Sequence, residues 1–221
     1  MQDKNITCIT VGEIATNCWI YPLPGSSGCA IIDPGAEADR IIACLKQLDL
    51  VPQYIVLTHG HFDHIGALPD LLAAYQTKTD IPQIAIHRLD SEYLGPGSYQ
   101  VHRTSFIAAA GSPVYIDHYW KDMPSPVRLL EEGDTIGPFI VMHIPGHTKG
   151  SIALWDKEAK NLFTGDTLFQ ADYGRTDLPG GNEDEIIASL RRLFAMDSEI
   201  DVFPGHGPTT TIGIEAKRKM I

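Results

Sequence analysis

The stretch Thr58-His59-Gly60-His61-Phe62-Asp63-His64 decides how this chain folds, because it places three histidines and an aspartate within seven residues. It follows the apolar segment Ile55-Val56-Leu57, which is typical of a buried β-strand. In a loop that leaves a strand, side chains two residues apart can point to the same side, so His59 and His61 can face one metal ion. Asp63 and His64 can then turn toward a second ion. The stretch therefore predicts a metal site at the end of a strand.

Three more ligand-type residues each follow an apolar segment and a glycine. They are the last residues of Pro145-Gly146-His147, Thr164-Gly165-Asp166 and Pro204-Gly205-His206. Glycine permits the tight turns that aim a side chain inward, and the ends of strands in one sheet converge on one edge. The full set of five histidines and two aspartates suits zinc, iron or manganese. We expect His147 to complete the first site, His206 to complete the second, and Asp166 to bridge two ions roughly 3.5–4 Å apart.

The remaining pattern predicts a single α/β domain over residues 1–221. Short apolar runs between turns predict strands, whereas an apolar stripe such as Ile41, Ile42, Leu45 and Leu48 predicts a helix. Asn182 opens a capping-box pattern at the start of another helix. The expected strands cover 6–11, 17–21, 30–33, 54–57, 83–87, 127–130, 139–144, 152–155, 161–164 and 201–204. The expected helices end before Pro52 or cover 67–75, 182–194 and 211–219.

Residues 89–126 are the least periodic part of the chain. They contain Gly95-Pro96-Gly97, the aromatic residues Tyr115, Tyr119 and Trp120, and Pro124-Ser125-Pro126. We expect this segment to be an irregular, lid-like insertion with some helix.

The composition excludes several classes of protein. With 17 basic and 28 acidic side chains among 221 residues, the formal net charge is −11, which a nucleic-acid backbone repels. No apolar run approaches the ~18 residues of a membrane span, and the first residues lack the pattern of a signal peptide. We expect a cytoplasmic protein that acts on a small molecule, with no nucleic-acid or membrane partner.

The cysteines form no disulfide or metal-binding motif. Cys8, Cys18, Cys29 and Cys44 lie in the first fifth of the chain, and no Cys-x-x-Cys pair occurs. We expect all of them to be buried, reduced and structural.

The ligand-type residues resemble the pattern of the metallo-β-lactamase superfamily, and the resemblance runs over essentially the whole chain. The nearest likeness is to the small stand-alone hydrolases of the hydroxyacylglutathione hydrolase (glyoxalase II) group, which share framing segments such as Thr16-Asn17-Cys18, Asp33-Pro34-Gly35 and residues 205–213. This resemblance implies an αββα sandwich with the metals at the rim of the sheets. It implies two divalent ions, with zinc preferred and iron or manganese as alternatives. Its ligand positions fall on His59, His61, Asp63, His64, His147, Asp166 and His206.

The resemblance also implies a reaction. Hydrolases of this group attack a carbonyl carbon with a hydroxide that bridges the two ions, so the expected activity is hydrolysis of thioesters such as S-lactoylglutathione. Asp63 and Asp166 are the candidate catalytic residues, since Asp166 would bridge the ions and Asp63 would orient the hydroxide or pass a proton to the leaving group. A serine nucleophile is not indicated, because no Gly-x-Ser-x-Gly motif occurs.

Three residues are candidates for substrate binding. Arg175 lies nine positions after Asp166, where glyoxalase II enzymes place a cationic lysine, and its guanidinium could hold a carboxylate. Arg175 could equally form a surface ion pair with Asp172 or Asp177. Lys149 and Tyr173 are further candidates at the rim, each with an ordinary surface role as the alternative. The remaining histidines, His87, His102, His118 and His143, are expected to be non-ligands.

Other activities remain open at this point. The chain also resembles persulfide dioxygenases, notably at Gly174-Arg175-Thr176-Asp177, which would use one iron held by His59, His147 and Asp166. The ending at 207–213 favours the hydrolases. A nuclease is disfavoured by the negative charge, and a true β-lactamase by Asp166, since those enzymes carry Cys or Ser there. A tyrosine that glyoxalase II enzymes carry two positions after the last histidine is Pro208 here, so recognition of glutathione is expected to be weak.

Overall fold

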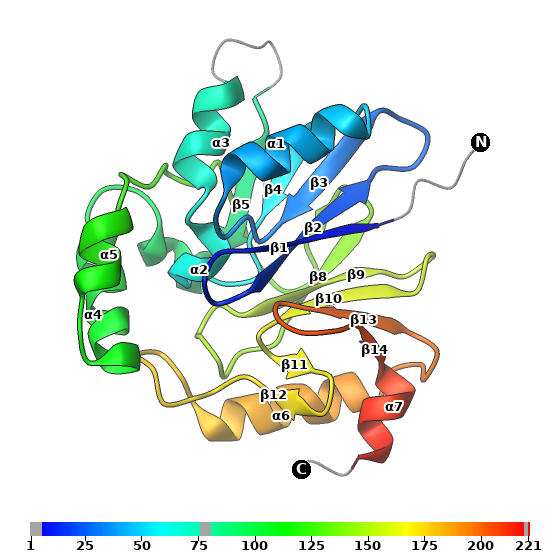
Figure 1. The fold of residues 1–221 in the computed structure, drawn as a ribbon. Coiled ribbons are helices and arrows are strands. Elements are labelled where there is room, and N and C mark those ends of the chain that lie inside the picture. The colour runs from blue at the N-terminus through cyan, green and yellow to red at the C-terminus, as the bar shows by residue number, and fades with distance from the viewer. Residues whose placement is uncertain (1–5, 76–80, 219–220) are drawn as a thin grey trace.

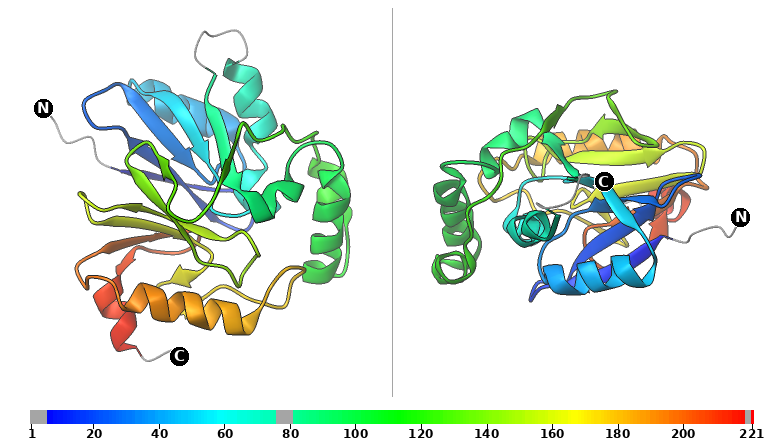
Figure 2. Two further views of the ribbon diagram at one scale, coloured as in Figure 1. Left: turned by 180° about the vertical axis from the view of Figure 1, so that it is seen from behind. Right: turned by 90° about the horizontal axis from the view of Figure 1, so that it is seen from above.

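A computed structural model describes residues 6–75, 81–218 and 221 of the chain. Two six-stranded sheets lie face to face in it (Figure 1). The helices α1 (Ala38–Gln47) and α3 (Leu68–Tyr75) cover the outer face of one sheet, and α6 (Glu183–Phe194) and α7 (Ile212–Lys217) cover that of the other (Figure 2). This arrangement confirms the predicted αββα sandwich.

The first sheet has the order β1-β2-β3-β4-β5-β6. The pairs β1–β2 and β2–β3 are antiparallel, whereas β3, β4, β5 and β6 run parallel. Because β3, β4 and β5 are parallel, the loops that follow them leave at the same edge. The strands are β1 (Thr7–Val11), β2 (Thr16–Pro22), β3 (Gly28–Ile32), β4 (Val51–Val56), β5 (Gln83–His87) and β6 (Arg128–Leu130).

The second sheet has the order β14-β13-β10-β9-β8-β7, and a small hairpin, β11–β12, lies beside it. Its strands β10 and β13 are parallel, so the loops carrying Asp166 and His206 also leave at one edge. The strands are β7 (Thr135–Ile136), β8 (Phe139–His143), β9 (Ile152–Asp156), β10 (Asn161–Gly165), β13 (Asp201–Pro204) and β14 (Thr210–Thr211), with β11 (Leu168–Phe169) and β12 (Asp172–Tyr173) in the hairpin.

The strands carry apolar residues on both faces because both faces are buried, one under helices and one against the other sheet. Along β2, Cys18 and Ile20 pack under the helices of the first sheet, whereas Trp19 and Tyr21 pack between the two sheets. Alternate side chains of a strand point to opposite faces, so a strand buried on both sides needs apolar residues throughout. The layer between the sheets is rich in aromatic rings, including Phe163 of the second sheet.

The segment 89–126 is more regular than its sequence predicts. A short 3₁₀ helix, η1 (Arg88–Tyr93), is followed by α4 (Ser98–Ala110) and α5 (Val114–Tyr119). The fully buried residues of α4 are Ser98, His102 and Ser105, whereas Val101 and Phe106 pack on the core only partly buried, so its most buried side chains are polar. A search for apolar periodicity misses such a helix. Both helices stand at the side of the sandwich near α2 (Phe62–Ile65), as Figure 1 shows.

A few details of the sequence predictions need correction. The last helix ends at Lys217, and Lys219 lies outside the described residues. All four cysteines are free, as expected, but only Cys18 and Cys29 are buried. Cys44 is partly buried, and Cys8 is exposed, because β1 is an edge strand whose Ile9 and Val11 point into the core. Among the described residues, no helix has both the length and the apolar character needed to cross a membrane.

Candidate metal centre

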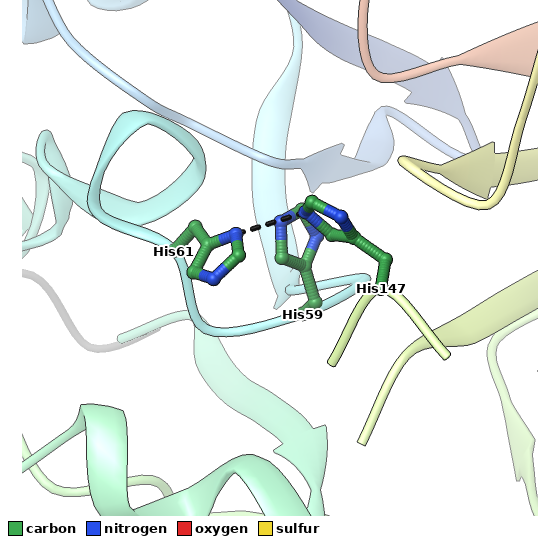
Figure 3. Close-up of side chains that lie close together, drawn as sticks. All are labelled: His59, His61 and His147. Carbon is green, nitrogen blue, oxygen red and sulfur yellow. Dashed lines mark hydrogen bonds between the residues drawn. The ribbon is translucent and has the colours of Figure 1, made fainter. Parts of the chain in front are cut away.

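Three histidines from two loops meet at the edge between the sheets. His59 and His61 lie in the loop between β4 and α2, and His147 lies in the loop between β8 and β9 (Figure 3). Their ligand atoms all lie within 4.8 Å of one another, and His61 Nδ1 is 2.9 Å from His147 Nε2. His59 Nε2 and His61 Nε2 are buried without a hydrogen-bond partner. A cation bound by these nitrogens would satisfy atoms that are otherwise costly to bury.

A second group forms beside it from Asp63, His64 and His206. Asp63 Oδ2 is 3.4 Å from His64 Nε2 and 3.3 Å from His206 Nε2. The two histidine nitrogens are themselves 3.3 Å apart. A carboxylate and two imidazoles in this arrangement form a donor set that suits a divalent metal.

Asp166 stands between the two groups. Its Oδ1 is 3.3 Å from His64 Nε2, and its Oδ2 is 3.6 Å from His147 Nε2 and 3.5 Å from His206 Nε2. Oδ1 is buried without a hydrogen-bond partner. The residue before His206 must be a glycine where the loops meet, since a Cβ at Gly205 would lie 2.2 Å from this Oδ1. All seven ligand-type residues identified in the sequence are therefore brought together.

Burial favours neutral imidazoles at His59 and His61. Burial, helped by the neighbouring His147, lowers the pKa of His61 to about 3. Burial and the neighbouring His64 likewise lower the pKa of His59 well below its usual value. A neutral imidazole has a lone pair for a metal, so these histidines are in the form that binds one.

The second group is held together by opposite charges. Burial opposes the charged form of His206, but Asp166 and Asp63 outweigh it and raise its pKa to about 10. Burial also opposes ionised carboxylates, yet His64 and His206 outweigh it and hold the pKa of Asp63 and Asp166 below the usual range. The carboxylates are therefore ionised, which is the form that binds a metal.

Several residues that sequence reasoning did not assign orient these side chains. Asp33 Oδ2 accepts hydrogen bonds from His64 Nδ1 at 2.9 Å and from Thr58 Oγ1 at 2.6 Å. Thr58 Oγ1 in turn lies 3.2 Å from His59 Nδ1. Thr16 Oγ1 donates to Asp63 Oδ2 at 3.0 Å. In the sequence, Thr16 and Asp33 stand out only as parts of the framing segments Thr16-Asn17-Cys18 and Asp33-Pro34-Gly35, and no role is predicted for either residue.

The three candidate substrate residues lie at the rim, and two of them already have side-chain partners. Arg175 is half exposed and pairs with Asp177 through two contacts, at 2.6 and 2.8 Å. Its backbone carbonyl accepts a hydrogen bond from His147 Nδ1 at 2.7 Å. The hydroxyl of Tyr173 donates to Glu183 at 3.1 Å, and Lys149 is exposed. Their role in binding a substrate stays a prediction.

The other histidines lie away from these groups. His87 stacks on His143 with ring centroids 4.2 Å apart, and His102 Nε2 donates to the carbonyl of Tyr93 at 2.9 Å. His118 is exposed on α5. None of the groups of metal-ligand type found among the described residues contains them.

Comparisons with known proteins agree with this geometry. A family model of the metallo-beta-lactamase superfamily matches residues 11–206. The hydroxyacylglutathione hydrolase GloC of Haemophilus influenzae is 33% identical, over 96% of this chain and 95% of its own. The di-iron-bound form of TTHA1623 is 35% identical with a TM-score of 0.82, and the alignment covers 97% of this chain and 98% of that one. The BLEG-1 B3 metallo-beta-lactamase is 33% identical with a TM-score of 0.81, over 96% and 97%. The resemblance seen in the motifs is thereby confirmed, and the chain belongs to the metallo-beta-lactamase superfamily.

Proposed function

We propose that this protein is a dinuclear metal-dependent hydrolase that cleaves thioesters of the S-lactoylglutathione type. The observation that carries the proposal is the position of Asp166, whose carboxylate faces His64 at 3.3 Å on one side and His147 at 3.6 Å on the other. One side chain thus joins two separate groups of donors. The name of the GloC relative supports a hydroxyacyl thioester as the substrate.

The donor set fits two metal ions. His59, His61 and His147 would hold one, Asp63, His64 and His206 would hold the other, and Asp166 would contact both. Such ions supply a Lewis acid for the carbonyl oxygen and lower the pKa of water toward ~7. Zinc is our first choice, although imidazole and carboxylate donors also accept iron or manganese, and the di-iron form of TTHA1623 supports iron.

In the proposed reaction, Asp63 takes up the proton of the attacking water. Thr16 Oγ1 fixes Asp63 Oδ2 from one side, and His206 Nε2 lies 3.3 Å away on the other. A carboxylate held in this way can accept one proton from water while the oxygen attacks the carbonyl carbon. When the carbon–sulfur bond breaks, Asp63 can return that proton to the leaving sulfur, so the products are a carboxylic acid and a thiol.

The experiment that tests this function compares substrates and counts metals. We expect about two divalent ions per chain and hydrolysis of S-lactoylglutathione and simple acyl thioesters, with lactones and a β-lactam assayed in parallel. Absence of activity on every thioester would contradict the hydrolase assignment. One iron per chain together with oxygen consumption on glutathione persulfide would instead identify a dioxygenase.

Removal of a ligand should separate activity from folding. We expect Asp166→Asn and His147→Ala each to abolish turnover while the circular dichroism spectrum stays native, because both residues lie in loops beyond strands that have their own apolar core. Hydrolysis within about tenfold of the unaltered protein would show that these residues are not ligands.

A further inference from the structure

Asp90 is a buried carboxylate that the proposed mechanism does not use. It lies in η1, between β5 and α4, and is 1% exposed. It accepts three hydrogen bonds, from the backbone N–H of Gly60 at 3.0 Å, from Thr148 Oγ1 at 2.7 Å and from the backbone N–H of Gly150 at 2.6 Å. A buried carboxylate is costly unless its hydrogen-bond donors stay in place. The Asp90 carboxylate therefore fixes the positions of these three donors relative to one another.

The donors belong to the two loops that carry the three-histidine group. Gly60 separates His59 from His61, and Thr148 directly follows His147. Asp90 Oδ2 contacts both loops at once, since it accepts from Gly60 and from Thr148. The carboxylate therefore sets the separation of the loops whose histidines must converge.

The packing around Asp90 leaves little freedom for these loops to shift. A Cβ at Gly150 would lie 2.6 Å from Asp90 Oδ1, and a Cβ at Gly60 would lie 2.1 Å from the ring of Tyr93, at the end of η1. The ring of Tyr93 also stands edge-on to His61, with centroids 5.8 Å apart. Glycine at both positions lets η1 approach the metal-ligand loops directly.

The second group of ligands is braced by different residues. Asp33 holds His64, and Thr16 holds Asp63. Asn17 Nδ2 donates to the carbonyl of Gly207 at 2.8 Å, which fixes the loop of His206. None of these contacts involves η1, so a change at Asp90 acts on the first group directly and can reach the second only through Asp166, which contacts both.

We propose that Asp90 is a positioning residue that sets the metal affinity of the His59, His61 and His147 group and leaves that of the Asp63, His64 and His206 group unchanged. This inference rests on the metal centre of the proposed function. In this proposal, η1 holds the histidines of one of the two sites in the geometry that binds a metal.

The test is metal release from the loaded full-length protein. Asp90→Asn keeps the shape of the side chain but replaces one acceptor oxygen by a donor, which must oppose at least one of the three donors. When a chromophoric chelator competes for bound Co²⁺, we expect one equivalent per chain to lose affinity by about 10–100-fold, the usual effect of a lost outer partner. The affinity for the other equivalent of Co²⁺ should change by less than about threefold, which is smaller than the effect of losing an outer hydrogen-bond partner.

Two further variants show which of the two sites holds the ion whose affinity falls. In His206→Gln, which keeps the three-histidine group, Asp90→Asn should again weaken the remaining ion about 10–100-fold. In His61→Gln, which keeps the other group, it should have no such effect. Asp156→Asn is the matched control. Asp156 is another buried carboxylate that accepts three hydrogen bonds, and it lies at the end of β9 that is far from the His147 loop. We expect it to leave both affinities unchanged.

A second variant covers the case in which Asp90→Asn does not fold. Thr148→Val removes the hydrogen bond from Thr148 Oγ1 to Asp90, together with the one between Thr148 Oγ1 and Ser151 Oγ, and leaves the carboxylate. The metal affinity of the same site should then fall about three- to tenfold. Equal weakening of both equivalents, or no weakening of either, would overturn the proposal. Because the readout is metal release, a failure of the thioester assay would overturn the proposed substrate without affecting this result.

Discussion

At the scale of single residues, three of the five histidines of the centre have one ring nitrogen engaged by a residue outside the centre. His64 Nδ1 bonds to Asp33, His59 Nδ1 faces Thr58 Oγ1, and His147 Nδ1 bonds to the carbonyl of Arg175. Such partners fix the tautomer and the ring plane of a ligand before a metal arrives. These three rings are therefore held in a fixed orientation by the folded chain itself.

Arg175 offers a test of substrate recognition at this scale. If its guanidinium holds a carboxylate of the substrate, Arg175→Ala should raise KM for S-lactoylglutathione more than it lowers kcat, since that contact exists in both the ground and the transition state. Asp177→Asn should then lower KM, because it frees the guanidinium from its partner. Steady-state kinetics check both variants. Unchanged KM in both would leave Arg175 with only its surface ion pair.

The donors of metal-ligand type could be predicted from sequence, but the residues that orient them could not. His59, His61, His147 and Asp166 stand next to glycines at the ends of apolar runs, which is a local signal. Asp33 and Asp90 act through contacts with residues 25 to 60 positions away, and those contacts exist only after the sheets have formed. Pairings across such distances leave no mark in a single sequence.

At the scale of elements, the start of α6 supports the loop that carries His147. The backbone N–H of Asn182 donates to the carbonyl of Gly146 at 2.8 Å, and Ser189 Oγ donates to that of Pro145 at 2.8 Å. The predicted cap is present, since Asn182 Oδ1 accepts from the N–H of Glu185 at 3.2 Å. The helix thus buries its apolar side against the sheet and anchors the His147 loop through Asn182 and Ser189.

The cap of α6 should be measurable as stability. We expect Asn182→Ala to lower the free energy of unfolding by about 1 kcal/mol, because the N–H of Glu185 loses its acceptor. Asn182→Ser, which retains a capping oxygen, should stay within a few tenths of a kcal/mol of the original chain. Urea denaturation of both variants checks this, and equal losses would show that the cap contributes nothing.

The elements that sequence predicted well are those with an apolar inward side. β2, β8 and α6 follow this rule, and their positions agree with the prediction within a residue or two. α4 does not follow it, because its fully buried residues are His102 and two serines, while its apolar Val101 and Phe106 are only partly buried. Apolar periodicity predicts burial in a hydrophobic core, but it does not detect burial against polar and aromatic neighbours.

At the scale of the whole molecule, buried histidines link stability to pH. Burial lowers the pKa of His102 to about 4 from its usual 6.5, against a weaker opposing effect of its bond to Tyr93. The unfolded chain therefore takes up a proton at a higher pH than the folded one, and stability falls as pH drops from 6.5 toward 4.

Replacing this histidine should flatten that dependence. Relative to His102→Gln, we expect the original chain to lose about 2–3 kcal/mol more stability between pH 7 and pH 4. His118→Gln, at an exposed position, should behave like the original chain. Urea denaturation across this pH range checks the prediction, and parallel curves for His102→Gln and the original chain would contradict it.

The hydrogen bonds that join the first sheet to the last metal-ligand loop span almost the whole chain. Asn17 reaches Gly207 across 190 positions, and Trp19 reaches Pro204 across 185. During synthesis on the ribosome, the first four ligand-type residues emerge long before His206, which completes the set. A nascent chain can therefore offer only part of the centre, and the second group cannot close until translation has passed residue 206. An ion that met the chain before that point would find an open and incomplete set of donors.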